Sequence, residues 1–204
     1  MKILITAGST WVRVDDVRIL TNCFTGKTGL YLARELKKKG HSITLLVNPH
    51  CIGEAQDVKA AYYHYFDEFK IMINKLLKNN HFDMIIHTAA VSDYKLKKHF
   101  KGKVSSGKKE LNLELIPAEK IIKQIRKLAR RSVLIQFKLE AKRKGLCEKA
   151  YESLRENKSD YVVANALEDL RRYKAFIIDK DKNITIINSK KNLARGIINR
   201  INLI

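Results

Sequence analysis

Cysteine, acidic residues and long apolar runs are scarce in this chain of 204 residues. Its three cysteines, Cys23, Cys51 and Cys147, are widely separated, and none forms a Cys-x-x-Cys pair. This spacing disfavours structural zinc and predicts free thiols in a reducing compartment. No apolar run approaches the roughly 20 residues of a membrane span. The N-terminus also has no charged-then-apolar leader. We therefore expect a cytoplasmic protein with no membrane partner.

Linker-like sequence is also lacking. The chain has 2 prolines and 9 glycines, and no segment is rich in either. Apolar residues make up 45% of the chain, which is near the globular average and argues against wholesale disorder. A chain of this length can bury its own core. The sequence therefore predicts a single domain spanning residues 1–204.

The shortage of acidic residues leaves a large positive charge. Lysine and arginine number 41 against 21 aspartates and glutamates, giving a formal net charge of +20. Such a charge can indicate nucleic-acid binding. However, the cations are spread over several segments, and no interleaving of aromatic and basic residues occurs. We favour solvated basic faces over a nucleic-acid surface, and a basic surface also suits an anionic, phosphorylated small substrate.

Apolar periodicity predicts alternating strands and helices. The expected strands are 2–7, 42–47, 83–87, 132–139 and 161–164. The expected helices are 26–39, 66–77, 117–130, 146–157 and 190–202. This alternation predicts an α/β fold, a Rossmann-like doubly wound sheet that is mostly parallel.

Three further segments complete the expected layout. The segments 174–179 and 184–188 flank a polar turn and predict a hairpin, which forms a small antiparallel annex. Leucines alternate with polar residues over 109–116, which predicts a half-exposed strand. Residues 48–66 and 95–107 are predicted to form irregular structure.

The stretch 3–29 carries the first functional signal. An apolar run leads into Thr6-Ala7-Gly8-Ser9-Thr10, and Gly26-Lys27-Thr28-Gly29 opens a helix. In an open α/β sheet, strand ends and helix N-termini of this kind bind anions. The loop lacks the G-x-G-x-x-G fingerprint of dinucleotide sites, and Thr21 stands where a phosphate-binding loop needs glycine. Tyr94 and Lys98 fit the Y-x-x-x-K pattern of reductases, but the missing glycines disfavour a nicotinamide enzyme.

Several motifs occur together in a fixed order. They are ILITAGST, VDDVRILTN, GKTG, HTAAVSDY, GKVSS, LIQFKL and SDYVVAN. In this combination the chain resembles phosphopantothenate–cysteine ligase (phosphopantothenoylcysteine synthetase), in the DNA/pantothenate metabolism flavoprotein C-terminal domain family. It is most similar to the stand-alone bacterial form, and the resemblance runs nearly end to end.

The resemblance implies a reaction of coenzyme A biosynthesis. The family activates 4′-phosphopantothenate with CTP, which gives an acyl-cytidylate and pyrophosphate. Cysteine then displaces CMP and forms the amide. Phosphate chemistry of this type implies Mg²⁺, and the family implies a homodimer. The alternatives left open are a nucleic-acid-binding or regulatory protein on the same fold and an NADPH-dependent reductase.

The resemblance also assigns roles to residues. It implies that Asn22 binds the acyl-nucleotidylate and that Lys103 stabilises charge at the α-phosphate, both as catalytic residues. It implies that Arg18 reaches the pantothenate half of the neighbouring protomer's site, with Asn22 and Ala90 also contacting substrate. The implied nucleotide-binding residues are Gly8, Ser9, Thr10, Ala89, Ala90, Val91, Asp93 and Phe137. No residue is implied as a metal ligand.

Each assignment has a plain structural alternative. Asn22 could cap a turn, Lys103 could be a solvated loop lysine, and Arg18 could form a local salt bridge with Asp15 or Asp16. Asp93 could form an Asx turn, and Phe137 could belong to the core.

The chain departs from the family pattern at a few positions. A His/Ser-rich run is replaced by Cys23-Phe24-Thr25, and Gln136 precedes the aromatic where many relatives have glycine. The lysines expected on the helix before SDYVVAN align with Glu152 or Ser153 and with Glu156 or Asn157, and Ala166 replaces an aspartate.

Overall fold

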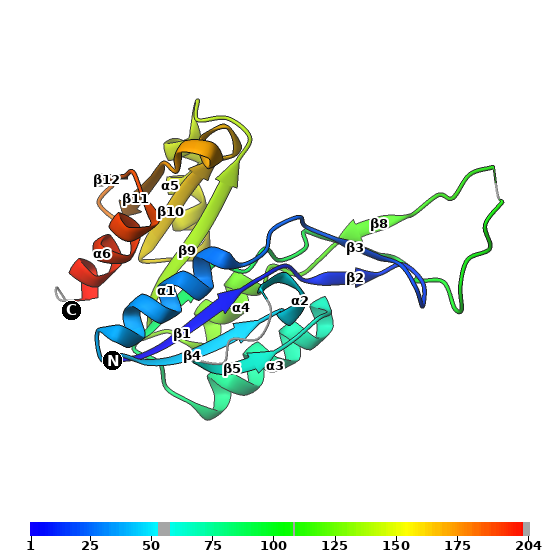
Figure 1. Cartoon of the computed structure of the whole chain (residues 1–204), viewed down its shortest axis with the longest axis horizontal. Coiled ribbons are helices and arrows are strands. Elements are labelled where there is room, and N and C mark those ends of the chain that lie inside the picture. Colours follow the sequence, from blue (N-terminus) through cyan, green and yellow to red (C-terminus); the bar gives the residue numbers. More distant parts are fainter. Residues whose placement is uncertain (53–57, 108, 202–204) are drawn as a thin grey trace.

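The computed structural model describes residues 1–52, 58–107 and 109–201. Within this part, one large sheet has the strand order β12-β11-β10-β9-β6-β1-β4-β5 (Figure 1). Its strands are β1 Lys2–Ala7, β4 Ser42–Val47, β5 Lys59–Tyr62, β6 Met84–His87, β9 Val133–Glu140, β10 Tyr161–Ala166, β11 Ala175–Asp179 and β12 Ile184–Ile187.

The strand pairing confirms the predicted fold class. The run from β5 through β4, β1, β6 and β9 to β10 is parallel throughout. The pairs β10–β11 and β11–β12 are antiparallel, so the predicted hairpin extends one edge of the sheet. Strand order reverses between β4 and β6 around β1, and ligands bind at such a switch point in open α/β sheets.

Helices cover both faces of this sheet. They are α1 Lys27–Lys38, α2 Pro49–Ile52, α3 Phe66–Asn79, α4 Ile121–Leu128, α5 Leu146–Asn157 and α6 Lys190–Ile201, with a 3₁₀ helix at Leu167–Arg172. On one face, α1 and α6 pack on β1, β4 and β11. On the other face, α3 and α4 pack on β1 and β6, and α5 packs on β10 and β11. The central strands are buried from both sides, as their continuous apolar runs predict.

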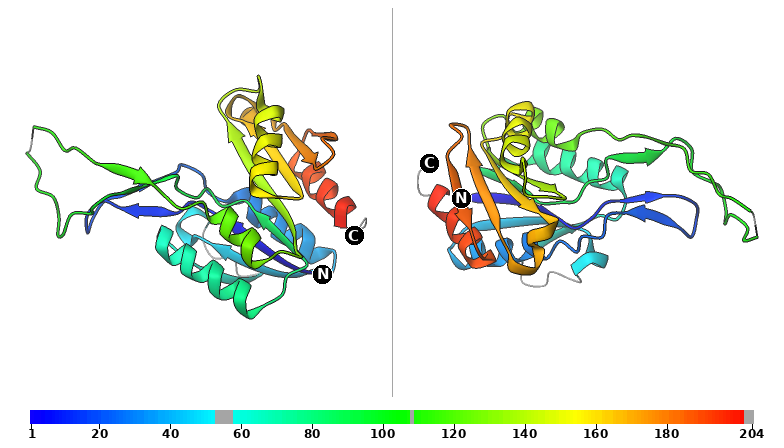
Figure 2. Two further views of the ribbon diagram at one scale, coloured as in Figure 1. Left: turned by 180° about the vertical axis from the view of Figure 1, so that it is seen from behind. Right: turned by 90° about the horizontal axis from the view of Figure 1, so that it is seen from above.

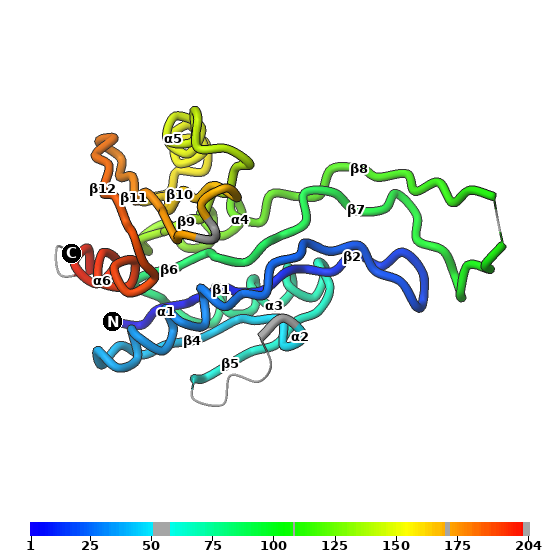
Figure 3. The backbone as a smooth tube through the Cα atoms, turned by 45° about the horizontal axis from the view of Figure 1, so that its top comes forward, coloured from blue at the N-terminus to red at the C-terminus, as the bar shows by residue number. Residues whose placement is uncertain are grey.

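An arm projects from this α/β body (Figure 1, Figure 2). We define the arm as residues 11–21 and 94–117, of which Lys108 lies outside the described residues. It contains the antiparallel pair β2 Trp11–Arg13 with β3 Ile19–Thr21, and the pair β7 Tyr94–Leu96 with β8 Leu115–Pro117. Figure 3 shows β2, β7 and β8 running out side by side, with the segment between β7 and β8 at the far end. A cluster of Val12, Val14 and Leu96 with Phe100 packed against it forms the arm's own small core.

Apolar side chains stay exposed along the arm. Val17 is 65% exposed, the largest value in this group. The exposed large apolar residues of the arm are Val17, Ile19, Leu20, Tyr94, Leu111, Leu113 and Leu115. A solvent-exposed apolar patch of this kind marks an interaction surface.

Four element predictions were wrong. The described part of 48–66 is not irregular, because it contains α2 and β5, and residues 53–57 of that range lie outside the described residues. The strand expected over 109–116 is confined to β8 at its end. Residues 109–114 form no strand, although the Glu114 carbonyl accepts from the Lys97 N–H at 3.0 Å just beyond β7. The helix expected from Pro117 starts at Ile121 instead, because Pro117 ends β8 opposite Tyr94. The loop after β1 contains β2 and β3, and residues 95 and 96 of the segment 95–107 belong to β7. These three strands are too short to show periodicity.

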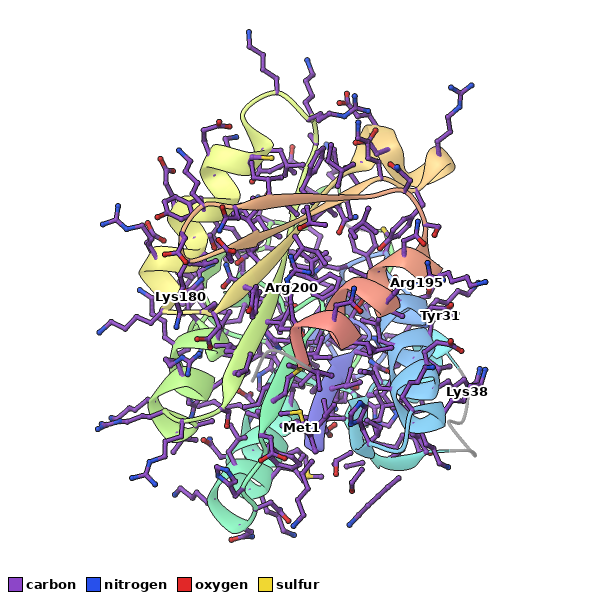
Figure 4. All side chains as sticks on the ribbon, turned by 90° about the vertical axis from the view of Figure 1, so that its left-hand side faces the viewer. Met1, Tyr31, Lys38, Lys180, Arg195 and Arg200 are labelled. Atoms are coloured by element: carbon purple, nitrogen blue, oxygen red, sulfur yellow. The ribbon has the colours of Figure 1, made fainter. Side chains whose placement is uncertain are left out.

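Cationic side chains lie on several elements at the end of the body opposite the arm (Figure 4). Figure 4 shows the end opposite the arm, where Lys38, Lys180 and Arg195 project from different elements. Among the described residues, no helix is both long enough and apolar enough to cross a membrane.

Candidate active site

The loop after β1 lies at the carboxyl edge of the sheet and is held rigidly. Gly8 has φ +85°, a left-handed conformation that glycine adopts without strain. The Tyr63 hydroxyl donates to the carbonyl oxygens of Ala7 and Gly8, at 2.8 and 3.0 Å. The Asn48 amide donates to the Ser9 carbonyl at 2.8 Å. The loop is therefore fixed by buried side chains from β4 and the segment after β5.

The end of β6 joins this loop through the backbone. The Ala90 N–H donates to the Gly8 carbonyl at 2.9 Å, and the Thr10 N–H donates to the Ala90 carbonyl at 3.3 Å. The Thr10 hydroxyl lies 3.0 Å from the Ser92 hydroxyl and accepts from the Ser92 N–H at 2.9 Å. These bonds continue the β1–β6 pairing beyond the regular strands. They bring together two motifs that lie about 80 residues apart, as the parallel pairing of β1 and β6 predicts.

Helix α1 begins directly against the loop. A Cβ atom on Gly26 would meet the Gly8 nitrogen at 2.5 Å, and one on Gly29 would meet the Ala7 Cβ at 2.6 Å. Gly26 also has φ +70°. Only glycine allows this close approach, so the positive end of the α1 dipole faces the loop. The arrangement favours a bound anion at this point.

Asn22 faces the same place from the end of β3. Its side-chain amide donates to the Ala90 carbonyl at 3.2 Å. The Ser9 hydroxyl lies 2.8 Å from the Asn22 carbonyl oxygen and 2.6 Å from that of Phe24. The Asn22 side chain is exposed, so it can exchange its backbone partner for a ligand. The thiol of the neighbouring Cys23 is free and exposed.

The structure thus brings most of the predicted nucleotide residues together. Gly8, Ser9, Thr10 and Asn22 meet the segment that holds Ala89, Ala90 and Val91. Phe137 lies on the adjacent strand β9, one residue past the His87–Gln136 pair, and packs on the core face shared by α1 and α6. Both of its expected readings therefore remain compatible with its position.

Asp93 lies farther along, at the start of the arm. Its carboxylate pairs with the Lys120 ammonium at 2.6 Å, and both side chains are exposed. Its carbonyl accepts from the Ala118 N–H at 2.8 Å. The Asx-turn alternative is replaced by a salt bridge to the residue that precedes α4.

Arg18 and Lys103 lie at the opposite end of the arm from Asn22. The three residue pairs of β2 and β3 separate them from the loop, which is roughly 10 Å of strand. The Arg18 guanidinium binds the Asp15 carboxylate and donates to the Val104 carbonyl at 3.2 Å. The predicted catalytic pair of Asn22 and Lys103 is therefore not assembled within one chain.

Two titratable groups near these segments have shifted pKa values. Burial lowers the pKa of His87 to about 4, and its Nδ1 lies 2.8 Å from the Thr6 hydroxyl. Burial opposes ionisation of Asp15, but hydrogen bonds from Val104, from two turn amides and from Arg18 hold the pKa of that carboxyl well below its ordinary value. His87 is thus neutral and Asp15 is charged at neutral pH.

Gln136 and the two departing positions on α5 form one cluster. The Gln136 amide nitrogen donates to the Ser153 hydroxyl at 3.2 Å, and its oxygen accepts from the Asn157 amide and the Ser159 hydroxyl, both at 3.0 Å. Of the open alignments, Ser153 and Asn157 are thus the residues that face Gln136. A neutral hydrogen-bonded cluster joins β9 to α5 beside Phe137.

Some residues of the site were missed from sequence. Asn48 was not singled out, although it directly follows the buried strand 42–47. Nothing in the sequence shows that the Tyr63 hydroxyl reaches the carbonyl oxygens of Ala7 and Gly8. Asp15 was considered only as a partner of Arg18.

The expected Mg²⁺ has no protein-built site in this part of the chain. The described residues contain no group of three or more histidine, cysteine or carboxylate side chains that could hold a metal ion. The residues present therefore do not fit a dedicated metal centre.

Comparison with known proteins identifies the family. Residues 1–203 match the DNA/pantothenate metabolism flavoprotein C-terminal domain. The chain is 33% identical over 188 residues to the coenzyme A biosynthesis bifunctional protein CoaBC of Borreliella burgdorferi, covering 88% of this chain and 46% of the relative. It is 32% identical over 176 residues to the CoaBC protein of Thermococcus kodakarensis, covering 82% and 41%. The chain thus spans less than half the length of these two relatives.

Solved structures share the fold. The DNA/pantothenate metabolism flavoprotein from Streptococcus pneumoniae matches with a TM-score of 0.89 and 23% identity, covering 100% and 99% of the two chains. The C-terminal domain of a CoaBC protein matches at 0.81 with 26% identity, covering 99% and 94%. A Cab2 variant in complex with phosphopantothenate-cysteine matches at 0.83 with 17% identity, covering 98% and 85%. The expected resemblance is confirmed, and the chain belongs to the DNA/pantothenate metabolism flavoprotein C-terminal domain family.

Proposed function

We propose that this protein is a phosphopantothenate–cysteine ligase of coenzyme A biosynthesis. It joins 4′-phosphopantothenate to cysteine through an acyl-cytidylate and consumes CTP. The observation that carries the proposal is the junction of the Gly8–Thr10 loop, Asn22 and the Ala90 segment at the N-terminus of α1. Family membership and the bifunctional CoaBC relatives support the substrate class.

The geometry suits a reaction between anions. A carboxylate that attacks an α-phosphate needs its charge neutralised and its position fixed, rather than a strong base. The helix N-terminus and the rigid loop provide backbone donors for phosphate oxygens. Asn22 carries an amide that can bind the acyl-nucleotidylate when it leaves Ala90, and Lys103 carries the cation for the α-phosphate.

We propose a homodimer in which the arm completes the neighbour's site. Arg18 and Lys103 lie at the far end of the arm, away from Asn22 of their own chain. The arm also exposes seven large apolar side chains, which a second copy can cover. In this arrangement Arg18 faces the pantothenate half and Lys103 faces the phosphates of the partner's site.

Mg²⁺ remains the metal that nucleotide chemistry requires. We propose that it arrives with CTP and is held largely by phosphate oxygens and water, as Mg²⁺ commonly is.

The direct test is turnover. Purified protein given phosphopantothenate, CTP, Mg²⁺ and cysteine is expected to release CMP and pyrophosphate. Asn22→Ala is expected to form the acyl-nucleotide and to pass it poorly to cysteine, because the amide acts on that intermediate. The absence of pyrophosphate release with both CTP and ATP would contradict the proposal, and normal turnover by Asn22→Ala would contradict the role of Asn22.

A further inference from the structure

Two segments that lie 86 residues apart in the sequence meet at the far end of the arm. The turn after β2 supplies one segment, and the loop after β7 supplies the other. The Phe100 N–H donates to the Val14 carbonyl at 2.9 Å, and the Asp16 N–H donates to the Gly102 carbonyl at 3.3 Å. The loop is therefore docked on the turn by its backbone.

Two carboxylates strengthen this docking on either side of one residue. Asp16 Oδ2 accepts from the Gly102 N–H at 3.0 Å. Asp15 Oδ2 accepts from the Val104 N–H at 3.0 Å. Lys103 lies between these two amides, so both of its neighbours in the chain are held by an aspartate from the turn. Hydrogen bonds to ionised acceptors are stronger than those between neutral groups.

The same carboxylates do not neutralise Lys103. Asp15 is paired with Arg18, and Asp16 lies 3.8 Å from the Arg13 guanidinium. Within the described residues, no ion pair of Lys103 occurs, and its side chain is exposed. The backbone around this lysine is fixed while its ammonium stays available to an outside anion.

We propose that Asp15 and Asp16 are positioning residues that fix the backbone on both sides of Lys103 and so aim its ammonium at the nucleotide phosphates. This inference rests on the proposed ligase function. Misplacing a charged group by about 1 Å can cost on the order of a hundredfold in rate, so a clamp on the flanking peptides matters for catalysis.

Asp15 also stabilises the turn to which it belongs. Asp15 Oδ1 accepts from the amides of Val17 and Arg18, at 2.8 and 2.7 Å. Asp15 therefore shapes the turn as well as holding the loop, whereas the Asp16 carboxylate holds the loop and also forms a 3.8 Å ion pair with the exposed Arg13. Asp16 is the cleaner target for an experiment.

Amide hydrogen exchange tests the clamp without relying on any activity. In the unmodified full chain, the amides of Gly102 and Val104 are expected to be protected. Asp16→Ala is expected to raise exchange at Gly102 at least tenfold, and Asp16→Asn less, because its amide oxygen can still accept the bond. Asp181→Ala, which removes an exposed carboxylate from the β11–β12 turn, is the matched control. Unchanged exchange at Gly102 in Asp16→Ala would overturn the proposal.

A double-mutant cycle tests whether the clamp acts through Lys103. Asp16→Ala is expected to lower kcat for pyrophosphate release about tenfold with a smaller change in KM for CTP. In a Lys103→Ala background, the same substitution is expected to have no further effect. An equal loss in both backgrounds would overturn the positioning role. If the unmodified protein releases no pyrophosphate, the ligase proposal and with it the catalytic role fail, whereas the exchange data still decide whether the clamp exists.

Discussion

Different interactions hold the loop at the strand-end site and the loop on the arm. At the strand ends, the Gly8 loop is fixed by glycine contacts, extended strand pairing and buried side chains such as Tyr63. On the arm, the Lys103 loop is fixed by two carboxylates, that of the buried Asp15 and that of the exposed Asp16. The arm has a core of only a few apolar residues. The first region should be rigid and intolerant of added volume. The second should depend on charge and on a covering partner.

The largest expected effect is steric and falls at the strand ends. Gly26→Ala forces a Cβ within 2.5 Å of the Gly8 nitrogen and keeps a positive φ. We expect a loss of about 4 kcal/mol in the free energy of unfolding, from overpacking and the left-handed conformation together. Gly40→Ala is the matched control, because φ there is +83° and nothing lies within 4 Å of the added Cβ.

Urea denaturation measures both variants. Gly40→Ala should cost only about 1 kcal/mol, the conformational part alone. Equal losses at the two glycines would show that the contact between α1 and the loop is looser than described.

The next effect is a pH dependence at the end of β6. His87 is buried with a pKa of about 4, while an unfolded histidine titrates near 6.5. As pH falls from about 6.5 towards 4, the unfolded chain binds a proton that the native state does not, so stability falls. The loss approaches about 3 kcal/mol at its upper limit.

The substitution His87→Gln should remove this part of the pH dependence. Unfolding free energies measured between pH 7 and pH 4 in the variant and in the unmodified protein give the comparison. The exposed His99, changed to glutamine, serves as the control for replacing a histidine by glutamine. A slope that persists in His87→Gln would contradict a buried, neutral His87.

A third effect distinguishes the arm by its need for a partner. Leu20→Asp places a charge on the apolar face of the arm, which a second copy would have to desolvate. We expect the dimer dissociation constant to rise at least tenfold, by about 1.4 kcal/mol or more. Ile184→Asp, at a comparably exposed isoleucine on the edge strand β12, should leave it unchanged.

Sedimentation equilibrium over a range of concentrations provides the measurement. A monomer at all concentrations in the unmodified protein would contradict the proposed dimer. An effect at Ile184 in place of Leu20 would move the interface from the arm to the sheet edge.

The smallest expected effect is the difference in unfolding free energy between a cavity in the core of the arm and one in the core of the body. Val14→Ala deletes two methyl groups from the small core of the arm, whereas Val163→Ala deletes them from β10 in the fully buried sheet. We expect about 1 kcal/mol for Val14 and about 2–3 kcal/mol for Val163, because the arm can collapse onto the space. Thermal or urea unfolding of each variant measures the cost. Equal costs would indicate that the arm is as well packed as the body.

The same contrast explains what the sequence could predict. Strands such as 42–47 are buried on both faces, so their apolar runs fixed both the element and its place in a parallel sheet. The arm strands are three residues long and owe their form to pairing with distant segments, which leaves no periodicity to read. The leucines of 109–115 alternate because one face is apolar, and this pattern does not distinguish a paired strand from an exposed segment.

The residues of the site differ in the same way in how far the sequence predicts them. Gly8 and Ala90 could be placed together because parallel strands end at one edge of a sheet. Asn22 follows an arm strand, and its place in the site was predicted from the resemblance. The roles of Asn48, Tyr63 and Asp16 depend on contacts with residues that lie dozens of positions away in the sequence. No local residue spacing predicts these contacts. Arg18 and Lys103 were assigned from resemblance alone, and their distance from Asn22 emerged only from the structure.

The most direct test of a site shared between two chains is subunit complementation. Asn22→Ala and Lys103→Ala are each expected to be inactive in the overall reaction as homodimers. When the two are mixed and allowed to exchange subunits, half of the dimers are mixed and each mixed dimer has one intact site. Overall turnover should therefore recover to about a quarter of the unmodified protein. Mixed dimers that form but recover no activity would show that Lys103 serves its own chain, and would contradict the account.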